Sequence, residues 1–418
     1  MIGHPDHTLG IQLRFSRFHI IIKLKLNLMR SVKLHRGNHF MDDKGLTTIA
    51  LKKINKTKVY QYIYKQKQTY KLQIVQDLQM GLSTVSQNLN QLEKEGLIER
   101  NGYFDSTGGR KAQVIQINRT ARISIGIGIL KDCIHLVAVD LYGDTIQTDT
   151  LQIAYQSSAV YYKTIGNALQ AFIEAAGYVH EAILGVSIAV QGIISTDGQF
   201  VNYGVIMENS QMKLTDFTDY IPYPCRLEHD SKAAGFFELW THPEIENAVV
   251  YLLNHNLGGA LILNGQLYRG QHMQSGLLEH FCVNPNGPAC YCGQQGCLET
   301  YCSVNAFINA AGADLTVFFN HVRQGELSAL QIWNDYLRHF AFAIRNVNMI
   351  TDCPIILSGY LAPYFIEKDI ETLCSYINQS NAFPMCQEQI LIGTKGQFTP
   401  AIGAALFYID AFLTAVMD

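Results

Sequence analysis

Four side chains that commonly bind metal ions lie within one short stretch of the chain. His280 is followed by Cys290, Cys292 and Cys297 in the spacing H-x9-C-x-C-x4-C, with two glycines between the last two cysteines. One imidazole and three thiolates complete a tetrahedral zinc site of the structural kind, which leaves no open position for a catalytic water. We therefore expect one structural Zn²⁺. The alternative is that these are four unrelated buried residues.

The ten cysteines raise the question of a disulfide-stabilised secreted protein. The N-terminus lacks the charged region, apolar core and small-residue cleavage site of a secretory signal, so we expect reduced thiols in the cytoplasm. The apolar run 18–29 is short and contains Lys23 and Lys25, so it cannot cross about 30 Å of hydrocarbon. We expect no membrane segment. Cys282 and Cys302 fall outside the metal spacing, and we expect them to be small buried side chains.

The length of 418 residues and the hydrophobic fraction of 48% allow two or three folded units with buried cores. Residues 1–40 show no sustained periodicity and precede Met41, which begins a segment typical of a domain. We expect 1–40 to be a disordered leader or a mis-assigned start. We expect residues 41–118 to form one domain and residues 119–418 to form another.

Charge is distributed unevenly between the two parts of the chain. The first 112 residues carry 19 Lys and Arg against 8 Asp and Glu, a net charge of +11, and the rest carries a net charge of −14. A small basic N-terminal unit is expected of a nucleic-acid-binding protein. The alternative is a basic surface that contacts only solvent, which would give the same net charge.

The N-terminal pattern predicts a helix-turn-helix. Apolar residues at helical spacing predict helices over residues 53–67 and 71–78, and a Met-Gly turn at 80–81 leads to a third helix. We expect Ser83 or Thr84 to cap that third helix.

The third helix is predicted to place Val85, Leu89 and Leu92 in the core and short polar side chains outside. Such polar groups can exchange hydrogen bonds with base edges in the major groove. The predicted base-contacting residues are Thr84, Ser86, Gln87 and Asn90. The structural alternative is a helix face that contacts only solvent.

A wing is predicted to follow the third helix. The stretches 97–100 and 114–117 have strand character and are joined by a loop rich in glycine. In that loop Arg110 and Lys111 are expected to contact phosphates or to enter the minor groove. The unit is therefore predicted to be a winged helix-turn-helix.

Beyond Arg122 apolar, strand-like runs alternate with helical segments, which predicts an α/β unit with two lobes and a cleft between them. The predicted strands are 123–129, 135–139, 184–190, 249–253 and 355–357.

Several motifs resemble those of the ROK family (repressors, open reading frames, sugar kinases). Three of them make up its zinc signature, with a Gly-x3-His, an Asn-Pro-Asn-Gly and a Cys-x-Cys-Gly-x2-Gly-Cys-Leu-Glu segment at 276–280, 284–287 and 290–299. The stretch 226–234 resembles the segment that carries the catalytic Asp of the kinases, here Asp230. The resemblance covers residues 55–415. It implies a two-lobed, actin-like fold of the sugar kinase type, preceded in the repressor branch by a winged helix-turn-helix.

The resemblance also implies an effector site in the cleft. The residues at positions that contact the sugar or line its cleft are Gly192, Asp230, His280 and Glu299. His280 would then bind zinc through one ring nitrogen and orient the other toward the sugar.

The chain departs from the family pattern in both parts of the cleft. Family kinases carry Asp-x-Gly-Gly-Thr at an ATP-phosphate site, but residues 126–131 here are Gly-Ile-Gly-Ile-Leu-Lys. The second phosphate segment survives as Leu-Gly-Gly-Ala at 257–260, and a glycine pair also suits any tight turn.

The sugar site departs from the family pattern as well. Leu277 replaces a sugar-binding Glu, and His229 replaces an Asn. A sugar group left unpaired costs about 1–3 kcal/mol, so we expect an unusual effector, a weakly bound one or none.

These features favour a DNA-binding transcriptional regulator of carbohydrate metabolism, in the first place a repressor, which responds to a sugar or sugar derivative. A homodimer or homotetramer would read a palindromic operator. We expect no enzymatic activity because the kinase phosphate motif is degraded. An ATP-dependent sugar kinase with an added N-terminal domain is the alternative, supported by Asp230. A third hypothesis, favoured by Leu277 and His229, is a C-terminal unit that binds a protein partner and no sugar.

Overall fold

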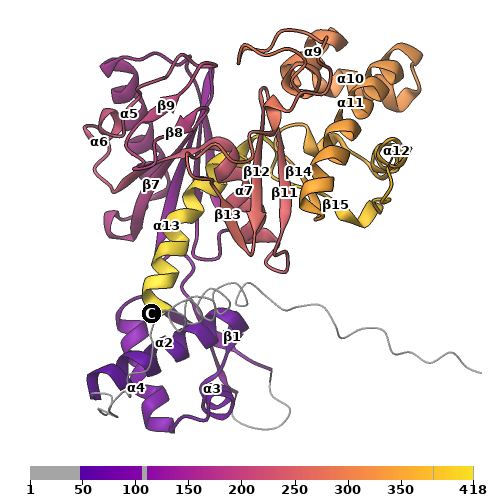
Figure 1. The fold of residues 1–418 in the computed structure, drawn as a ribbon. Coiled ribbons are helices and arrows are strands. Elements are labelled where there is room, and N and C mark those ends of the chain that lie inside the picture. Colours follow the sequence, from indigo (N-terminus) through magenta and orange to yellow (C-terminus); the bar gives the residue numbers. More distant parts are fainter. Residues whose placement is uncertain (1–47, 106–110, 380, 418) are drawn as a thin grey trace, which may run out of the picture.

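One small sheet and two five-stranded sheets organise the chain. The computed structural model describes residues 48–105, 111–379 and 381–417, and Figure 1 shows an N-terminal helical unit below two lobes. The predicted leader, residues 1–40, lies outside the described residues.

The N-terminal unit has the predicted helices and one strand that the sequence pattern did not indicate. Its helices are α2 (Thr48–Gln66), α3 (Lys71–Leu78) and α4 (Leu82–Lys94). Its strands, β1 (Gln68–Thr69), β2 (Ile98–Tyr103) and β3 (Gln113–Ile117), pair in the order β1-β3-β2. Val85, Leu89 and Leu92 are buried, as predicted.

The start of α4 differs from the prediction. Gly81 is its N-cap residue, and no side chain there accepts a hydrogen bond from the first turn. The prediction that Ser83 or Thr84 caps this helix was wrong. The reason is that Gln79, at φ 51, ends α3 in the left-handed conformation, and the chain resumes helical geometry as early as Leu82.

The first lobe is built on the sheet β10-β7-β4-β5-β6. Its strands are β4 (Ile123–Ile129), β5 (Cys133–Val139), β6 (Thr145–Gln152), β7 (Ile183–Val190) and β10 (Cys225–His229). β4 pairs in parallel with β7, and β7 with β10, whereas β4, β5 and β6 form an antiparallel meander. The helix α5 (Ala159–Ala176) contributes its buried face to the core of this lobe. The hairpin of β8 (Ile193–Ile194) and β9 (Val201–Tyr203) and the short α6 (Thr215–Thr218) complete it.

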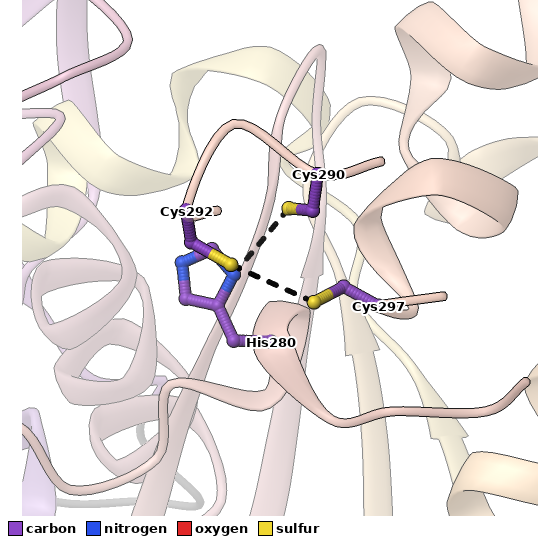
Figure 2. Close-up of side chains that lie close together, drawn as sticks. All are labelled: His280, Cys290, Cys292 and Cys297. Carbon is purple, nitrogen blue, oxygen red and sulfur yellow. Dashed lines mark hydrogen bonds between the residues drawn. The ribbon is translucent and has the colours of Figure 1, made fainter. Parts of the chain in front are cut away.

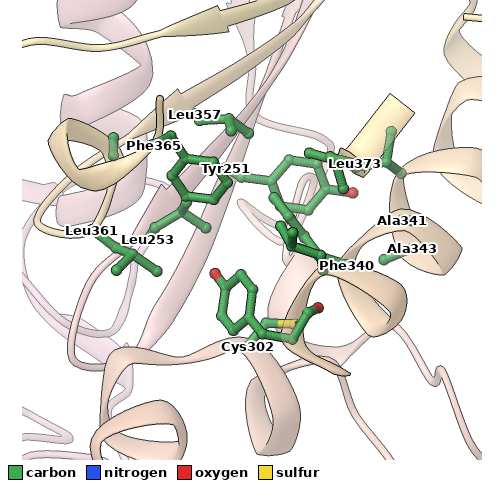
Figure 3. Packing of buried hydrophobic residues seen from close by; sticks show 14 of the residues in the cluster. Tyr251, Leu253, Cys302, Phe340, Ala341, Ala343, Leu357, Leu361, Phe365 and Leu373 are labelled. Atoms are coloured by element: carbon green, nitrogen blue, oxygen red, sulfur yellow. The ribbon is translucent and has the colours of Figure 1, made fainter. Parts of the chain in front are cut away.

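The second lobe repeats the five-stranded arrangement in the order β13-β12-β11-β14-β15. Its strands are β11 (Ala248–Leu253), β12 (Leu257–Leu263), β13 (Gln266–Tyr268), β14 (Ile355–Ser358) and β15 (Ile390–Ile392). Its helices are α8 (Glu299–Cys302), α9 (Val304–Ala311), α10 (Leu315–Gln324), α11 (Leu327–Thr351) and α12 (Glu367–Asn378). Tyr251 and Phe340 meet edge to face at 5.0 Å in the core between sheet and helices, and Cys302 lies buried in the same cluster (Figure 3).

Two helices join the lobes, α7 (Asp230–Thr241) and α13 (Thr399–Met417). Both crossings depend on glycine. A Cβ added at Gly126 of β4 would lie 1.8 Å from the carbonyl oxygen of Ala401, and one at Gly403 would lie 1.8 Å from the carbonyl oxygen of Ala233 on α7. Backbones therefore touch where α13 crosses the first sheet and where it crosses α7.

Helix α13 is also the described segment that is long and apolar enough to cross a membrane by length and composition. It packs against β4, β7 and α7 instead, and 56% of its most apolar window is buried. We assign it to the protein core.

The lower end of α13 reaches the N-terminal unit (Figure 1). The hydroxyl of Thr57 on α2 donates to the carbonyl oxygen of Val416 at 3.0 Å. The Tyr64 hydroxyl donates to the Leu141 carbonyl oxygen at 3.0 Å, and its ring stacks on Tyr142 at 4.7 Å. Apolar residues of α2, α4, β5 and α13 belong to one buried cluster. The N-terminal unit is thus joined to the first lobe by a shared core.

The crossing of α13 and α7 gives a stability prediction. We expect Gly403→Ala to lower the free energy of unfolding by about 3 kcal/mol or more, because the new methyl group meets a backbone carbonyl that cannot rotate away. Urea unfolding followed by circular dichroism measures the loss.

Gly81→Ala is the matched control, because its new Cβ would lie 3.8 Å from the hydroxyl of Thr84, at ordinary contact distance. We expect a change below about 1 kcal/mol. Equal urea-unfolding midpoints for the two variants would show that the crossing of α13 and α7 tolerates an added methyl group.

Candidate functional site

The structure brings the four predicted metal ligands together. His280 ends the 3₁₀ turn η2 (Leu278–His280), and the three cysteines lie on the loop that leads to α8. Their ligand atoms all lie within 4.8 Å of one another. Cys290 Sγ lies 3.7 Å from His280 Nδ1, and Cys292 Sγ lies 3.7 Å from Cys297 Sγ (Figure 2).

Backbone contacts shape the ligand loop. Gly293 and Gly296 have φ of 90° and 66°, and a Cβ at Gly296 would lie 1.6 Å from the carbonyl oxygen of Asn284. The amide of Val283 donates to the Gly296 carbonyl at 2.8 Å, and the amide of Cys290 donates to the Gln294 carbonyl at 2.8 Å. The glycines therefore allow a tight double turn that presents the three thiols on one side.

The donor set fits one tetrahedral ion. Zinc–sulfur bonds of about 2.3 Å place tetrahedral sulfurs about 3.8 Å apart, close to the observed 3.7 Å between Cys292 and Cys297. Burial raises the pKa of the Cys290 and Cys297 thiols, so these groups stay protonated unless a cation stabilises the thiolates. Cys302 is buried as predicted, whereas Cys282 is exposed, because its side chain lies at the rim of the loop and reaches the Gln295 carbonyl.

A cavity of about 310 Å³ opens beside the cluster, between the lobes. Gly192, which follows β7, Asp230, the first residue of α7, and His280 all line it. Leu277 lines it as well. With Nδ1 of His280 toward Cys290, the other ring nitrogen of His280 is available to the cavity side.

Burial dominates the electrostatics of this cavity. It raises the pKa of Asp230 to about 7, although the Ser231 amide donates to this carboxylate at 2.7 Å, and it lowers the pKa of His229 to about 3. Lys232 is buried behind the cavity and donates to the carbonyl oxygens of Gly259 and Ser275 at 2.7 and 2.5 Å. Burial lowers the pKa of Lys232 to about 8.

Glu299 is placed differently from the other predicted effector residues. It is buried, and its two carboxylate oxygens accept hydrogen bonds from Asn256 Nδ2 and the Leu257 amide, both at 2.7 Å. It does not line the 310 Å³ cavity, although Asn256 and Leu257 do. Its contact with an effector stays a prediction, and in this conformation it braces the turn between β11 and β12.

The cavity also contains a residue that the sequence analysis did not single out. Glu279 lines the cavity between two predicted features, Leu277 and His280. Burial raises its pKa to about 8, with Lys232 acting in the opposite direction. The sequence did offer a signal for this residue, because Glu279 is acidic and stands next to a predicted metal ligand. That Glu279 lines the cavity depends on the turn η2, which the sequence pattern did not predict.

Residues 126–131, where the phosphate motif is predicted to be degraded, lie in β4 and the turn after it. Gly128 and Leu130 border a space of only about 10 Å³, together with His135, Asp230 and Pro400. A space of this size holds one water at most. The glycine pair 257–260 lies in β12, where a Cβ at Gly259 would lie 2.6 Å from Leu278, so packing alone requires a glycine there.

The predicted DNA-binding side chains lie on α4 and beside the wing. Gln87 and Asn90 are exposed, and Thr84 and Ser86 are half-buried. The Ser86 hydroxyl donates to the Leu82 carbonyl at 2.8 Å, and Asn90 accepts a hydrogen bond from Arg100 at 3.1 Å. These two groups therefore have to exchange partners before they contact bases. Lys111 is exposed, and Arg110 lies outside the described residues.

Comparison with known proteins adds the following similarities. The sequence profile of the ROK family matches residues 122–411. The chain is 26% identical over 385 residues to the xylose repressor of Bacillus spizizenii, covering 88% of this chain and 97% of that protein. It is 22% identical over 253 residues to the transcriptional dual regulator NagC of Escherichia coli, covering 60% of this chain and 62% of that protein.

Solved structures show the same fold. A ROK family transcriptional regulator, a homologue of the Escherichia coli MLC protein, superposes with a TM-score of 0.69 at 16% identity, over 88% of this chain and 98% of that one. A ROK family glucokinase from Streptomyces griseus, in complex with glucose and AMPPNP, superposes with a TM-score of 0.60 at 19% identity, over 68% of this chain and 98% of that one. The two-lobed, actin-like sugar kinase fold is therefore shown, and the first of these structures spans the N-terminal unit as well.

Proposed function

The chain belongs to the ROK family, and from that premise we propose that it is a DNA-binding transcriptional repressor that responds to a sugar. The observation that carries the proposal is a helix-turn-helix with an exposed polar helix face, joined by a shared core to a two-lobed unit that leaves a space of only about 10 Å³ beside Gly128 and Leu130. Relatives that match over most of the chain are named xylose repressors. Such a protein acts in the cytoplasm.

The link between cavity and DNA-binding unit consists of two helices. Asp230 in the cavity is the first residue of α7, α7 packs on α13, and α13 meets α2 through Val416 and Thr57. A ligand that favours one arrangement of the lobes would therefore shift the DNA-binding units as well, provided that its affinity differs between the two states. A homodimer or homotetramer would place two copies of α4 on a palindromic operator.

Base readout by α4 gives the first functional prediction. Genomic footprinting with the purified full chain at moderate salt should reveal specific sites. On such a site Gln87→Ala should weaken binding by about 1–3 kcal/mol, because an exposed amide reads a base edge, with little change on unrelated DNA. Lys111→Ala should weaken binding to the specific site and to unrelated DNA alike. It should also reduce by about 1 the slope of the logarithm of affinity against the logarithm of salt concentration. Electrophoretic mobility shifts at several salt concentrations measure these effects.

Gln170→Ala serves as the control. Gln170 is an exposed glutamine on α5 of the first lobe, outside the N-terminal unit, so this variant should bind DNA as the unaltered chain does. The absence of any specific site, or equal effects of Gln87→Ala and Gln170→Ala on a specific site, would contradict readout by α4.

We further propose that the cluster of His280 and the three cysteines holds one structural Zn²⁺. The support is the mutual spacing of the four donors and their burial. With four protein ligands the ion would have no open position, so its contribution is to hold the loop that lines the cavity. His280 would bind it through Nδ1, the nitrogen that faces Cys290.

The zinc proposal predicts close to one zinc ion per purified chain. Cys297→Ser should lose most of that zinc and unfold at a lower temperature, because metal binding stabilises the folded state. Elemental analysis and thermal unfolding measure both. Cys282→Ser, on the same loop but outside the cluster, should keep its zinc. Zinc retained by Cys297→Ser, or lost equally from both variants, would count against this ligand set.

The kinase alternative predicts sugar-dependent ATP turnover, and we expect none. The space beside Asp230 on the β4 side measures about 10 Å³, which is too small for the phosphates of a nucleotide. A coupled assay for ADP release, run with neutral, aminated and acidic sugars, measures this. Turnover that rises with sugar and disappears in Asp230→Asn would restore the kinase hypothesis.

A further inference from the structure

The cavity is lined by a carboxyl group of which one oxygen finds no hydrogen-bond partner in the described part of the protein. Glu279 is only 5% exposed, and its Oε2 is buried without a hydrogen-bond partner. The residue nonetheless lines the 310 Å³ cavity. A buried carboxylate in this condition is costly unless something brings donors to it.

The nearest cation does not supply that donor. Lys232 lies close enough to Glu279 to attract it electrostatically, but its ammonium donates to the carbonyl oxygens of Gly259 and Ser275. Its attraction offsets part of the charge on Glu279 and leaves the oxygen without a hydrogen bond.

The cavity offers an anionic ligand no cationic partner in the described part of the protein. Asp230 and Glu279 line it, and none of its lining residues in the described chain is a lysine or an arginine. His229, whose pKa is lowered by burial, adds no positive charge near neutral pH. Burial raises the pKa of Asp230, and an anionic ligand would likewise be taken out of water in this cavity without a cationic side chain to pair with.

The rest of the lining suits an uncharged ring. Leu277, Ile193 and Ile206 offer apolar contact, and Gln191 and Gln274 bring amide groups. Leu277 supplies no acceptor for a hydroxyl. Glu279, two residues further along the same turn, places an acceptor in the same wall of the cavity.

We propose that Glu279 is the effector-contacting acceptor of this cavity and that, together with Asp230, it restricts the cavity to neutral or aminated sugars and excludes sugar phosphates and sugar acids. The inference rests on the proposed sugar response and adds to it the residue and the charge class.

The test uses the full, metal-loaded chain and isothermal titration with xylose, glucose, glucosamine, glucose 6-phosphate and glucuronic acid. We expect binding by at least one of the first three and no binding by the two anions. Glu279→Gln should weaken sugar affinity about 10- to 100-fold, because one of the two carboxyl oxygens that can accept a hydrogen bond is replaced by an amide nitrogen, which only donates. The variant should also reduce the difference in affinity between glucose and glucose 6-phosphate.

Glu238→Gln is the matched control. Glu238 is as deeply buried, its Oε2 likewise lacks a hydrogen-bond partner in the described chain, and it lies on α7 facing Ser358 rather than the cavity. It should leave sugar affinity unchanged. Thermal unfolding of both variants checks that each is folded, and the comparison of neutral with anionic sugars needs no variant.

Three results would overturn the inference: tighter binding of an anionic sugar than of its neutral parent, equal affinity in Glu279→Gln and the unaltered chain, or no binding by any of the five sugars. Footprinting tests the DNA-binding function separately, so specific DNA binding without sugar binding would overturn this inference and leave that function standing.

Discussion

The contact between α13 and α7 is the interaction on which the rest of this structure depends. At Gly403 the backbone of one helix lies against the Ala233 carbonyl of the other, and at Gly126 the first sheet lies as close to Ala401. Side chains cannot fill such crossings, so backbone contact fixes the position of α13 against the first sheet and against α7. Helix α7 in turn packs on β12 of the second lobe, so the two lobes meet through this helix pair.

The same helix pair relates the cavity to the DNA-binding unit. Asp230 lies at one end of α7, and Val416 at the far end of α13 contacts α2. A helix moves largely as a rigid body, so a small rotation at the cleft becomes a displacement at α2. The pair α7 and α13 is therefore the route by which the proposed sugar response would reach α2.

Much of this architecture was predictable from the sequence, for identifiable reasons. Strand β4 was predicted with its observed bounds because Ile123–Ile129 alternates isoleucine with small residues, and the clustering of His280 with the three cysteines was predicted because their spacing is specific. Strand β1 was missed because two residues carry no periodicity. The start of α4 was misplaced because Gln79 adopts the left-handed conformation, which glutamine rarely does and which its residue type therefore does not predict. The partners of Glu299 and Glu279 could not be predicted, since they depend on how the β11–β12 turn and η2 meet in space.

The hydrogen bond between Thr57 and Val416 joins residues 359 positions apart. On the ribosome, the apolar face of α2 emerges long before the helix that covers it, so the N-terminal unit spends most of translation with part of its core uncovered. Contacts of such long sequence separation form slowly and leave apolar surface open to aggregation. Chains interrupted before α13 would therefore expose this surface. Completion of the two-lobed unit is thus a condition for a fully folded DNA-binding unit.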